Sequence, residues 1–324
     1  MHVIVTGGLG FIGSNFIRYL LSEYPDIFIT NIDAQTYAGR LDNLTDIEER
    51  KNYQYFKGNI QDSDFVQNII KKYSPDCIIN FAAETHVDRS IESAQPFIYT
   101  NIVGVHILLE NALKNSIRFI QISTDEVYGS INPPDQFTEE SSIKPNSPYS
   151  ASKAAADQLI RAYNKTYDLN TVIVRCSNNF GPYQFPEKVI PYFISLAIGN
   201  KKLPVYGDGL NVRDWIYVED FCSAIRIVLE KGQTGNIYNV GGECELTNLD
   251  LTKRILTRLK KPETLINYVK DRPGHDRRYA MDCSKIKSKL GWKRKYNFEE
   301  GLDKTINWYK DNTEWTEGRR KEFV

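Results

Sequence analysis

Cysteine and histidine are scarce in this 324-residue chain, and their spacing argues against two kinds of site. The five cysteines are odd in number, lack Cys-x-x-Cys spacing, and in places lie in apolar runs such as Asp76-Cys77-Ile78-Ile79. This usage favours buried, reduced thiols and a cytoplasmic location over a secreted disulfide framework. The four histidines show no pairing at metal-ligand spacing, so we expect no metal site.

The chain also lacks a charge excess, a long apolar run and a targeting segment. Lys and Arg together number 41, as do Asp and Glu, so no net field would recruit nucleic acid or an anionic membrane. No run approaches the ~20 apolar residues that cross a bilayer, and the first strand starts at once, without a signal core before it. We therefore expect a cytoplasmic enzyme or binding protein with neither nucleic-acid nor membrane partners.

Short apolar runs alternate with helical patterns in the first half of the chain. Strands are expected at residues 2–5, 28–32, 53–57, 77–81, 119–122 and 171–174, and the longer helices at 13–23, 98–115 and 149–167. Such alternation predicts an α/β fold: a doubly wound parallel sheet covered by helices on both faces. After about residue 178, loops and aromatic residues increase, which indicates a smaller C-terminal substrate-binding lobe at 178–324. Segments within about 212–242 could return to the first domain, at 1–177.

A glycine-rich loop, Thr6-Gly7-Gly8-Leu9-Gly10-Phe11-Ile12-Gly13, follows the first expected strand and opens a helix. Glycines there let the backbone approach a pyrophosphate, whose charge the helix N-terminus stabilises. Asp33 closes the next strand, where a carboxylate accepts hydrogen bonds from ribose hydroxyls and disfavours a 2′-phosphate. The pattern predicts an NAD-binding Rossmann domain at 1–177, although the nearby Arg40 complicates the choice of NAD over NADP.

A second cluster of reactive side chains follows the strand expected at 119–122. The string Ser123-Thr124-Asp125-Glu126-Val127-Tyr128-Gly129 places a hydroxyl before two adjacent carboxylates. Tyr149 and Lys153 are four residues apart on a helix and share one face, where the ammonium could lower the pKa of the phenol. These groups could supply an oxidation base and a separate acid and base. The alternative for the two carboxylates is a solvent-exposed pair at a helix start or in a loop.

The glycine loop, the Tyr149-x3-Lys153 pair and Thr124 together resemble the extended short-chain dehydrogenase/reductase family. Within it, the string at 123–129 is similar to that of the nucleotide-sugar 4,6-dehydratases. Further similar stretches, spread over nearly the whole chain, are 82–90, 176–184, 211–215 and 271–279. The departures from the pattern are Thr85 for a common serine, Phe180 for a common tyrosine and Asn59 for a common aspartate.

The resemblance implies a lyase that removes water from dTDP-glucose by C4 oxidation, C5/C6 elimination and return of the hydride to C6. Oxidation comes first because only a C4 ketone makes the C5 proton acidic. Tyr149, held as phenolate by Lys153 and bound NAD, would take the C4 hydroxyl proton, while Thr124 binds O4. Glu126 would then remove the C5 proton, and Asp125 would protonate the departing C6 hydroxyl.

The resemblance also implies two sets of binding residues. Those expected at NAD are Gly7, Gly10, Phe11, Ile12, Gly13, Asp33, Ala34, Thr36, Asn59, Ile60, Ala82, Ala83, Thr100, Tyr149, Lys153 and Asn179. Those expected at the nucleotide sugar are Glu84, Thr85, His86, Thr124, Asn178, Lys188, Val189, Pro204, Tyr206, Arg213, Asn248, Arg272 and His275. Lys188, Arg213 and Arg272 would bind the diphosphate, because cations suit phosphate oxygens.

Three alternatives remain open at this point. A UDP-glucose 4,6-dehydratase would differ only in the pocket for the base, because uracil lacks the one methyl group that thymine carries. A nucleotide-sugar 4-epimerase would share the oxidation step but would not need Asp125 and Glu126. A catalytically silent NAD-sensing module would be free to lose all five catalytic residues. Whichever holds, the helices at 101–115 and after Tyr149 are apolar on more than one face, which predicts a homodimer through a four-helix bundle, with core packing as the competing account.

Overall fold

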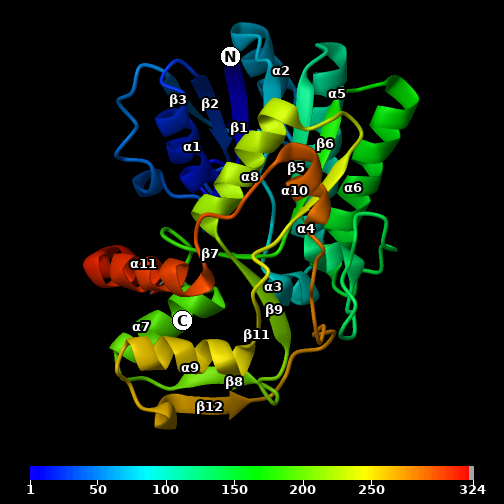
Figure 1. The fold of residues 1–324 in the computed structure, drawn as a ribbon. Coiled ribbons are helices and arrows are strands. Elements are labelled where there is room, and N and C mark those ends of the chain that lie inside the picture. The colour runs from blue at the N-terminus through cyan, green and yellow to red at the C-terminus, as the bar shows by residue number, and fades with distance from the viewer. Residues whose placement is uncertain (321–324) are drawn as a thin grey trace.

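Seven parallel strands form the central sheet of the computed structural model, which describes residues 1–320 (Figure 1). They are β1 (His2–Thr6), β2 (Phe28–Asp33), β3 (Tyr53–Lys57), β4 (Cys77–Asn80), β5 (Arg118–Thr124), β6 (Thr171–Cys176) and β10 (Ile237–Val240). Their order across the sheet is β10-β6-β5-β4-β1-β2-β3. The doubly wound parallel sheet is thus confirmed. Its strand order reverses between β1 and β4, where ligands bind in sheets of this kind.

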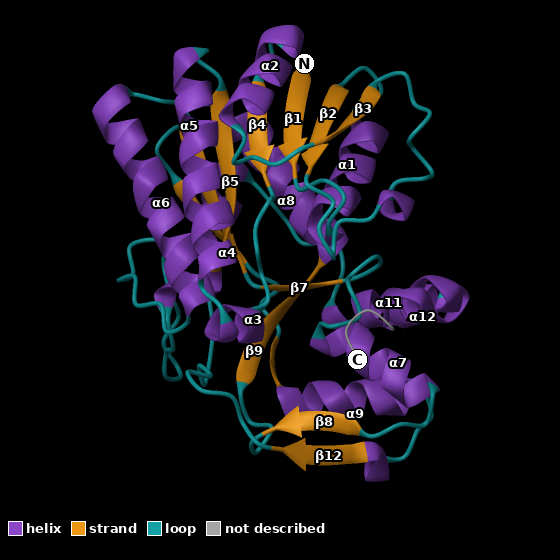
Figure 2. Cartoon of the chain, turned by 180° about the vertical axis from the view of Figure 1, so that it is seen from behind, coloured by secondary structure: helices purple, strands orange, loops and turns teal. Residues whose placement is uncertain are grey.

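Helices cover both faces of this sheet, as the opposite views show (Figures 1 and 2). One face carries α1 (Phe11–Glu23), α8 (Val218–Lys231) and α10 (Ser284–Leu290). The other carries α2 (Ser63–Tyr73), α5 (Val105–Lys114) and α6 (Pro148–Tyr167). Apolar side chains at helical spacing make each contact: Phe16 and Phe221 are fully buried on the first face, and Leu108 and Ile160 on the second.

The long helix expected at 98–115 is divided in the structure. It consists of α4 (Gln95–Ile98), a π-helical turn η2 (Tyr99–Gly104) and α5. The buried Asn101 lies in the π turn, and its side chain accepts the Glu84 N–H at 2.9 Å and donates to the Glu84 carbonyl at 3.0 Å. The same amide donates to Ser152 Oγ at 2.8 Å. The wider turn therefore ties the segment after β4 to the first turns of α6.

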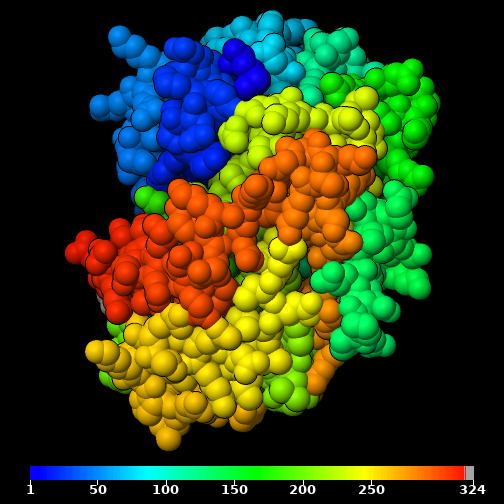
Figure 3. All heavy atoms as spheres, in the orientation of Figure 1, coloured from blue at the N-terminus to red at the C-terminus, as the bar shows by residue number. Residues whose placement is uncertain are grey.

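A smaller group of elements forms the second lobe. Its helices are α7 (Val189–Ile198), α9 (Asn248–Arg258) and α11 (Phe298–Asp311). Its strands are β7 (Asn178–Phe180), β9 (Val212–Tyr217) and β11 (Glu245–Thr247) in one sheet, and β8 (Leu203–Tyr206) and β12 (Ile266–Val269) in another. Phe180, Phe193, Trp215, Leu251 and Leu302 belong to its separate apolar core. In the space-filling view, α11 lies between the blue N-terminal elements and the yellow α9 (Figure 3).

The chain passes between the two groups more than once. After β9, which pairs with β7 and β11, α8 and β10 return to the large sheet, and β11 leaves it again. The short helices that complete the described residues are α3 (Val87–Glu92), α12 (Thr313–Arg320), η1 (Leu41–Asn43), η3 (Asp125–Tyr128) and η4 (Glu263–Leu265). Among residues 1–320, no helix has the length and apolar character needed to cross a membrane.

Candidate active site

A cavity of about 330 Å³ opens at the carboxyl ends of the strands around the β1/β4 reversal. Its lining includes every residue expected in catalysis or at the cofactor, from Gly7 in the glycine loop to Asn179 on β7. Of the residues expected at the substrate, Glu84, Thr85, Thr124, Asn178 and Lys188 also line it. The remaining ones lie outside this lining: His86, Val189, Pro204, Tyr206, Arg213, Asn248, Arg272 and His275.

The glycine loop forms a tight cradle at one end of this cavity. Gly7 has φ of +71°, and a Cβ placed on it would lie 2.5 Å from the backbone nitrogen of Ala82. A Cβ on Gly13 would lie 2.4 Å from the Gly7 carbonyl oxygen. Gly10 precedes α1 without a side-chain cap, so the first N–H groups of the helix stay available to an anion. This cradle fits the diphosphate of a dinucleotide.

Asp33 stands at the end of β2, beside this cradle. One carboxylate oxygen accepts the Leu9 N–H at 2.9 Å and the other accepts the Gln35 N–H at 2.7 Å. Burial raises the pKa of Asp33, and the two backbone N–H groups oppose that shift. A carboxylate held in this way can accept a further hydrogen bond from a ribose hydroxyl but would repel a 2′-phosphate. This acceptor fits the ribose of NAD better than that of NADP.

The two adjacent carboxyl groups follow the end of β5 directly. Thr124 caps η3: its hydroxyl accepts the Glu126 N–H at 3.3 Å and donates to Asp125 Oδ1 at 3.2 Å. Burial, and then the neighbouring charge of Glu126, raise the pKa of Asp125 well above its usual range. Burial also raises the pKa of Glu126, but the nearby cations Arg213, Arg272 and Lys188 oppose that rise. Burial therefore raises the pKa of both carboxyl groups, but the charge of Glu126 adds to the rise at Asp125, whereas three cations oppose the rise at Glu126.

Tyr149 and Lys153 face the same cavity from the start of α6, which begins with a capping box between Ser147 and Ser150. The Lys153 ammonium donates to the Ile122 carbonyl at 2.7 Å. Burial raises the pKa of Tyr149 well above its usual range, and its hydrogen bond with Thr124 opposes that rise. Burial is therefore the largest influence on the pKa of this phenol in the chain alone.

Burial lowers the pKa of Lys153 to about 8, although the carboxylate of Asp157 opposes this shift. That carboxylate is held by Arg175 on β6, whose Nε lies 2.9 Å from it. The side chains of Asp157 and Arg175 are 0% and 2% exposed. A buried pair of this kind is costly to break from one side, so it fixes α6 against the sheet one turn beyond Lys153.

Lys153 is expected to lower the stability of the free protein near neutral pH. Its folded pKa of about 8 lies below the 10.5 of an ordinary lysine, so the unfolded chain binds more protons between these values. The free energy of unfolding should therefore rise with pH by about 3 kcal/mol from this residue between pH 7 and 10.5. Urea unfolding of Lys153→Met, which removes the titration, should lose that rise relative to wild type.

The matched control is Lys287→Met, which removes an exposed lysine paired with Glu243. It should follow the wild-type pH dependence. If the free energies of unfolding of wild type and Lys153→Met changed with pH in parallel, the site would not disfavour the charged form of Lys153.

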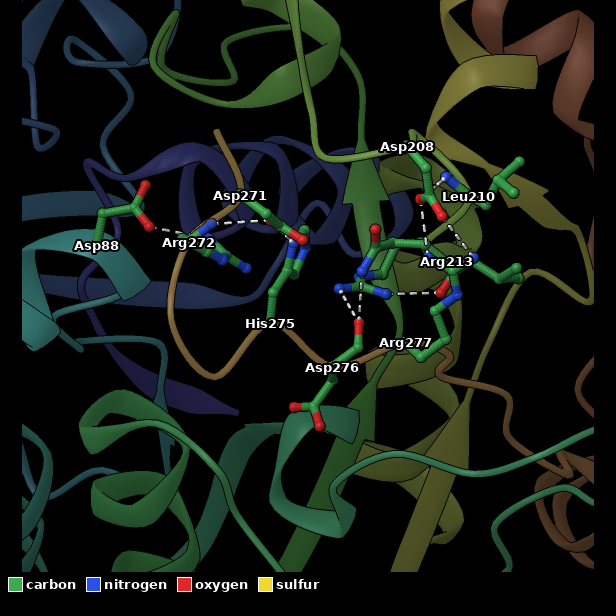
Figure 4. A network of polar contacts seen from close by, with 11 residues as sticks. Asp88, Asp208, Leu210, Arg213, Asp271, Arg272, His275, Asp276 and Arg277 are labelled. Carbon is green, nitrogen blue, oxygen red and sulfur yellow. Dashed lines mark hydrogen bonds and ion pairs between the residues drawn. The ribbon is translucent and has the colours of Figure 1, made fainter. Parts of the chain in front are cut away.

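Basic side chains gather on the substrate side, around the loop at 270–279 (Figure 4). Arg213 Nη2 donates to the Asp276 carbonyl at 2.9 Å. Arg272 lies 3.2 Å from an oxygen of Asp88, which belongs to α3 of the first domain. Lys188 donates to the Thr85 carbonyl at 3.1 Å. These contacts bring the three expected diphosphate cations to the same end of the site as Glu126, where all three oppose the rise of its pKa.

Some residues that line the cavity were not predicted from the sequence to belong to the site. They include Phe185 and Glu187, which follow Asn179 in the loop before α7. Only their position in the sequence could have indicated them. Asn179 and Lys188 were both expected at the site, so the loop between these two residues must also pass close to the cavity. Their burial depends on distant segments: Phe185 packs edge-on against Tyr37 with ring centroids 5.4 Å apart.

Comparison with known proteins gives a consistent result. The family model described as GDP-mannose 4,6 dehydratase matches residues 4–305. A curated dTDP-glucose 4,6-dehydratase from Xanthomonas campestris pv. campestris is 47% identical over 97% of this chain and 95% of its own.

Two solved structures are similar over the whole fold. The dTDP-glucose 4,6-dehydratase from Bacillus anthracis, in complex with NAD, is 49% identical with a TM-score of 0.94, over 98% of this chain and 99% of that one. The dTDP-glucose 4,6-dehydratase from Streptomyces venezuelae, also with NAD bound, is 44% identical with a TM-score of 0.96, over 98% of this chain and 100% of that one. The chain therefore belongs to the nucleotide-sugar dehydratases of the extended short-chain dehydrogenase/reductase family, among the dTDP-glucose 4,6-dehydratases.

Proposed function

We propose that the chain removes water from dTDP-glucose to give dTDP-4-keto-6-deoxy-glucose, with NAD regenerated in each turnover. The observation that carries this proposal is the pair Asp125 and Glu126. Both line the cavity that Tyr149 and Lys153 also line, burial raises the pKa of both, and nearby cations oppose this rise at Glu126. One carboxyl that keeps its proton and one that loses it match an elimination, which needs an acid and a base together.

Tyr149 is the proposed base of the oxidation step. Its phenol takes the proton of the C4 hydroxyl, and the Thr124 hydroxyl holds O4 beside it. When bound, NAD⁺ supplies a hydride acceptor and a positive charge that favours the phenolate, which burial alone disfavours. Lys153, held on the Ile122 carbonyl, keeps a second positive charge next to the phenol below about pH 8.

Glu126 and Asp125 are the proposed base and acid of the elimination. Once C4 is a ketone, Glu126 removes the proton from C5, and Asp125 gives its proton to the departing C6 hydroxyl. As the hydride taken from C4 is delivered to C6, the same Glu126 returns a proton to C5 at the end of the turnover. Lys188, Arg213 and Arg272 are proposed to bind the diphosphate, and their positive charge keeps Glu126 available as a base.

Product analysis tests this proposal directly. The purified protein is incubated with dTDP-glucose and, separately, with UDP-glucose, without added reductant, and the products are identified by mass and by NMR. We expect loss of one water from dTDP-glucose. Loss of water from UDP-glucose alone would favour the uridine nucleotide, and an isobaric galactose product would favour a 4-epimerase. The relative from Xanthomonas campestris and the two solved structures described above are named dTDP-glucose 4,6-dehydratases, which supports the thymidine nucleotide.

We also propose a homodimer formed through a four-helix bundle, in the cytoplasm. Ile98 and Tyr99 are 48% and 49% exposed on the α4–η2 helix, and Tyr167 is 54% exposed on α6. Large apolar side chains exposed along two neighbouring helices suit burial against a second copy. The cytoplasmic location is supported by the five cysteines, which are all free. A monomeric mass at micromolar concentration would rule the dimer out.

A further inference from the structure

A buried arginine on β6 contacts both of the segments that carry the proposed catalytic residues. Arg175 is 2% exposed and lies inside the large sheet, where its register partners are Ser123 on β5 and Asn239 on β10. Its Nε donates to Asp157 Oδ2 at 2.9 Å, and its Nη1 donates to the Tyr128 hydroxyl at 2.8 Å. Asp157 belongs to α6, and Tyr128 is the last residue of η3. The proposed mechanism gives Arg175 no task.

The hydroxyl of Tyr128 is held from two sides. It accepts the hydrogen bond from Arg175 and donates to Asn239 Oδ1 at 2.8 Å. Burial raises the pKa of Tyr128 to about 12, so the hydroxyl keeps the proton that it donates. The buried ring stacks on that of Phe137, with centroids 4.9 Å apart. The side chain of Tyr128 therefore has a fixed place in the core.

This fixed place matters to the site because Asp125 and Glu126 belong to the same turn, η3, which is only four residues long. The hydrogen bonds of so tight a turn have poor geometry and hold its shape weakly. Thr124, the last residue of β5, anchors one end of η3, and Tyr128 anchors the other. The two carboxyl groups of the proposed elimination thus lie between two anchors, and Arg175 holds the second one.

The other partner of Arg175 lies on α6, the helix that carries the oxidation pair. Asp157 is one turn beyond Lys153, and its carboxylate opposes the lowering of the lysine pKa by burial. A buried ion pair is often no more stabilising than apolar side chains of the same volume, so stability does not account for this one. A guanidinium does supply geometry, because it presents several N–H donors in one rigid plane. This single group holds η3 and α6 at a fixed separation.

We propose that Arg175 is a positioning residue that joins the two halves of the reaction, holding η3 with its acid and base against α6 with its tyrosine and lysine. The inference rests on the proposed function, in which Tyr149 acts at C4 and Glu126 at the neighbouring C5. A misplacement of about 1 Å can slow a reaction step by up to ~10²-fold. A loosened η3 should therefore slow the elimination. The oxidation should survive, because Thr124, Tyr149 and Lys153 belong to β5 and α6.

The test measures the two steps separately in Tyr128→Phe and Arg175→Lys. The first variant removes only the hydroxyl. The second keeps a cation beside Asp157, but a single ammonium cannot reproduce the donors to both partners. After mixing with dTDP-glucose in deuterated buffer, stopped-flow absorbance gives the rate of cofactor reduction, and NMR of quenched samples gives deuterium entry at C5. Both variants should reduce the cofactor within about twofold of the wild-type rate but exchange C5 about 10-fold more slowly.

A double variant and two controls sharpen the result. Tyr128→Phe combined with Arg175→Lys should be no slower than either single variant, because both changes break the same contact. Tyr238→Phe removes another buried hydroxyl, which accepts the Gln233 N–H, and should behave as wild type. Arg118→Lys, at the start of β5, changes a guanidinium that holds two backbone carbonyls and should also behave as wild type.

The inference has clear points of failure. Equal slowing of both steps in Tyr128→Phe would make the contact merely structural, and C5 exchange within about twofold of wild type would show that η3 does not need Arg175. If Arg175→Lys does not fold, Tyr128→Phe decides alone, since it leaves the ion pair with Asp157 intact. A wild-type protein that reduces NAD but exchanges no C5 proton would instead refute the proposed function, and this inference with it.

Discussion

Glu126→Gln is expected to stop solvent deuterium from entering at C5 of the sugar, while C4 is still oxidised. The amide keeps the size and hydrogen-bonding shape of the side chain but cannot take a proton. Because Tyr149, Lys153 and Thr124 are untouched, the oxidation step should survive and reduced cofactor should accumulate. Product formation should fall by about 10²- to 10⁴-fold, the usual contribution of a positioned general base.

The measurement combines NMR of the sugar in deuterated buffer with the absorbance of reduced nicotinamide. Glu230→Gln, which alters an exposed carboxylate paired with Arg226, is the control and should behave as wild type. Deuterium incorporation at C5 at the wild-type rate would assign the C5 base to another residue, with Asp125 the first to examine.

Tyr149→Phe is expected to abolish the first step instead, again by about 10²- to 10⁴-fold. Without the phenol, no group at this place can take the C4 hydroxyl proton, so neither reduced cofactor nor C5 exchange should be seen. The ring itself should stay in position, because it is buried and packs edge-on against Phe97, with centroids 6.3 Å apart. Stopped-flow absorbance after mixing with dTDP-glucose measures the step.

The two variants therefore give different signatures for one reaction. Glu126→Gln should reduce the cofactor without exchanging C5, whereas Tyr149→Phe should do neither. Tyr268→Phe, at a tyrosine that is 56% exposed, controls for the loss of a hydroxyl elsewhere. Cofactor reduction at an undiminished rate in Tyr149→Phe would remove the phenol from the oxidation step.

Much of the fold could be predicted because its signals are local. A five-residue segment with three aromatic residues gives β3 with the same bounds in sequence and structure, Tyr53–Lys57. The glycine loop is equally local, since a Cβ on Gly13 would meet the backbone of Gly7 only six residues away. Asp125 and Glu126 were found in the same way, because they directly follow the end of a strand.

Other features depend on groups that are distant in the sequence, and these could not be predicted. The π turn at Tyr99–Gly104 interrupts an apolar pattern that reads as one continuous helix, and the contacts of Asn101 within it are with Glu84 and Ser152. The burial of Glu187 depends on Tyr37 in the loop after β2 and on Arg89 in α3. The raised pKa of Tyr149 in the chain alone also could not be predicted, since spacing indicates the nearby lysine but not the depth of burial.

The return of β10 to the large sheet has a consequence for how the nascent chain folds. β10 is the neighbour of β6, and about 60 residues separate the two strands in the sequence. Until the ribosome has made these residues and β10, β6 is an open edge whose backbone groups can pair with another chain. At about 5–20 residues per second, that edge stays uncovered for roughly 3–12 s of synthesis. A protein built in this way completes its large sheet only after part of the second lobe has been made, so a chain that stalls between the two strands is exposed to aggregation through β6.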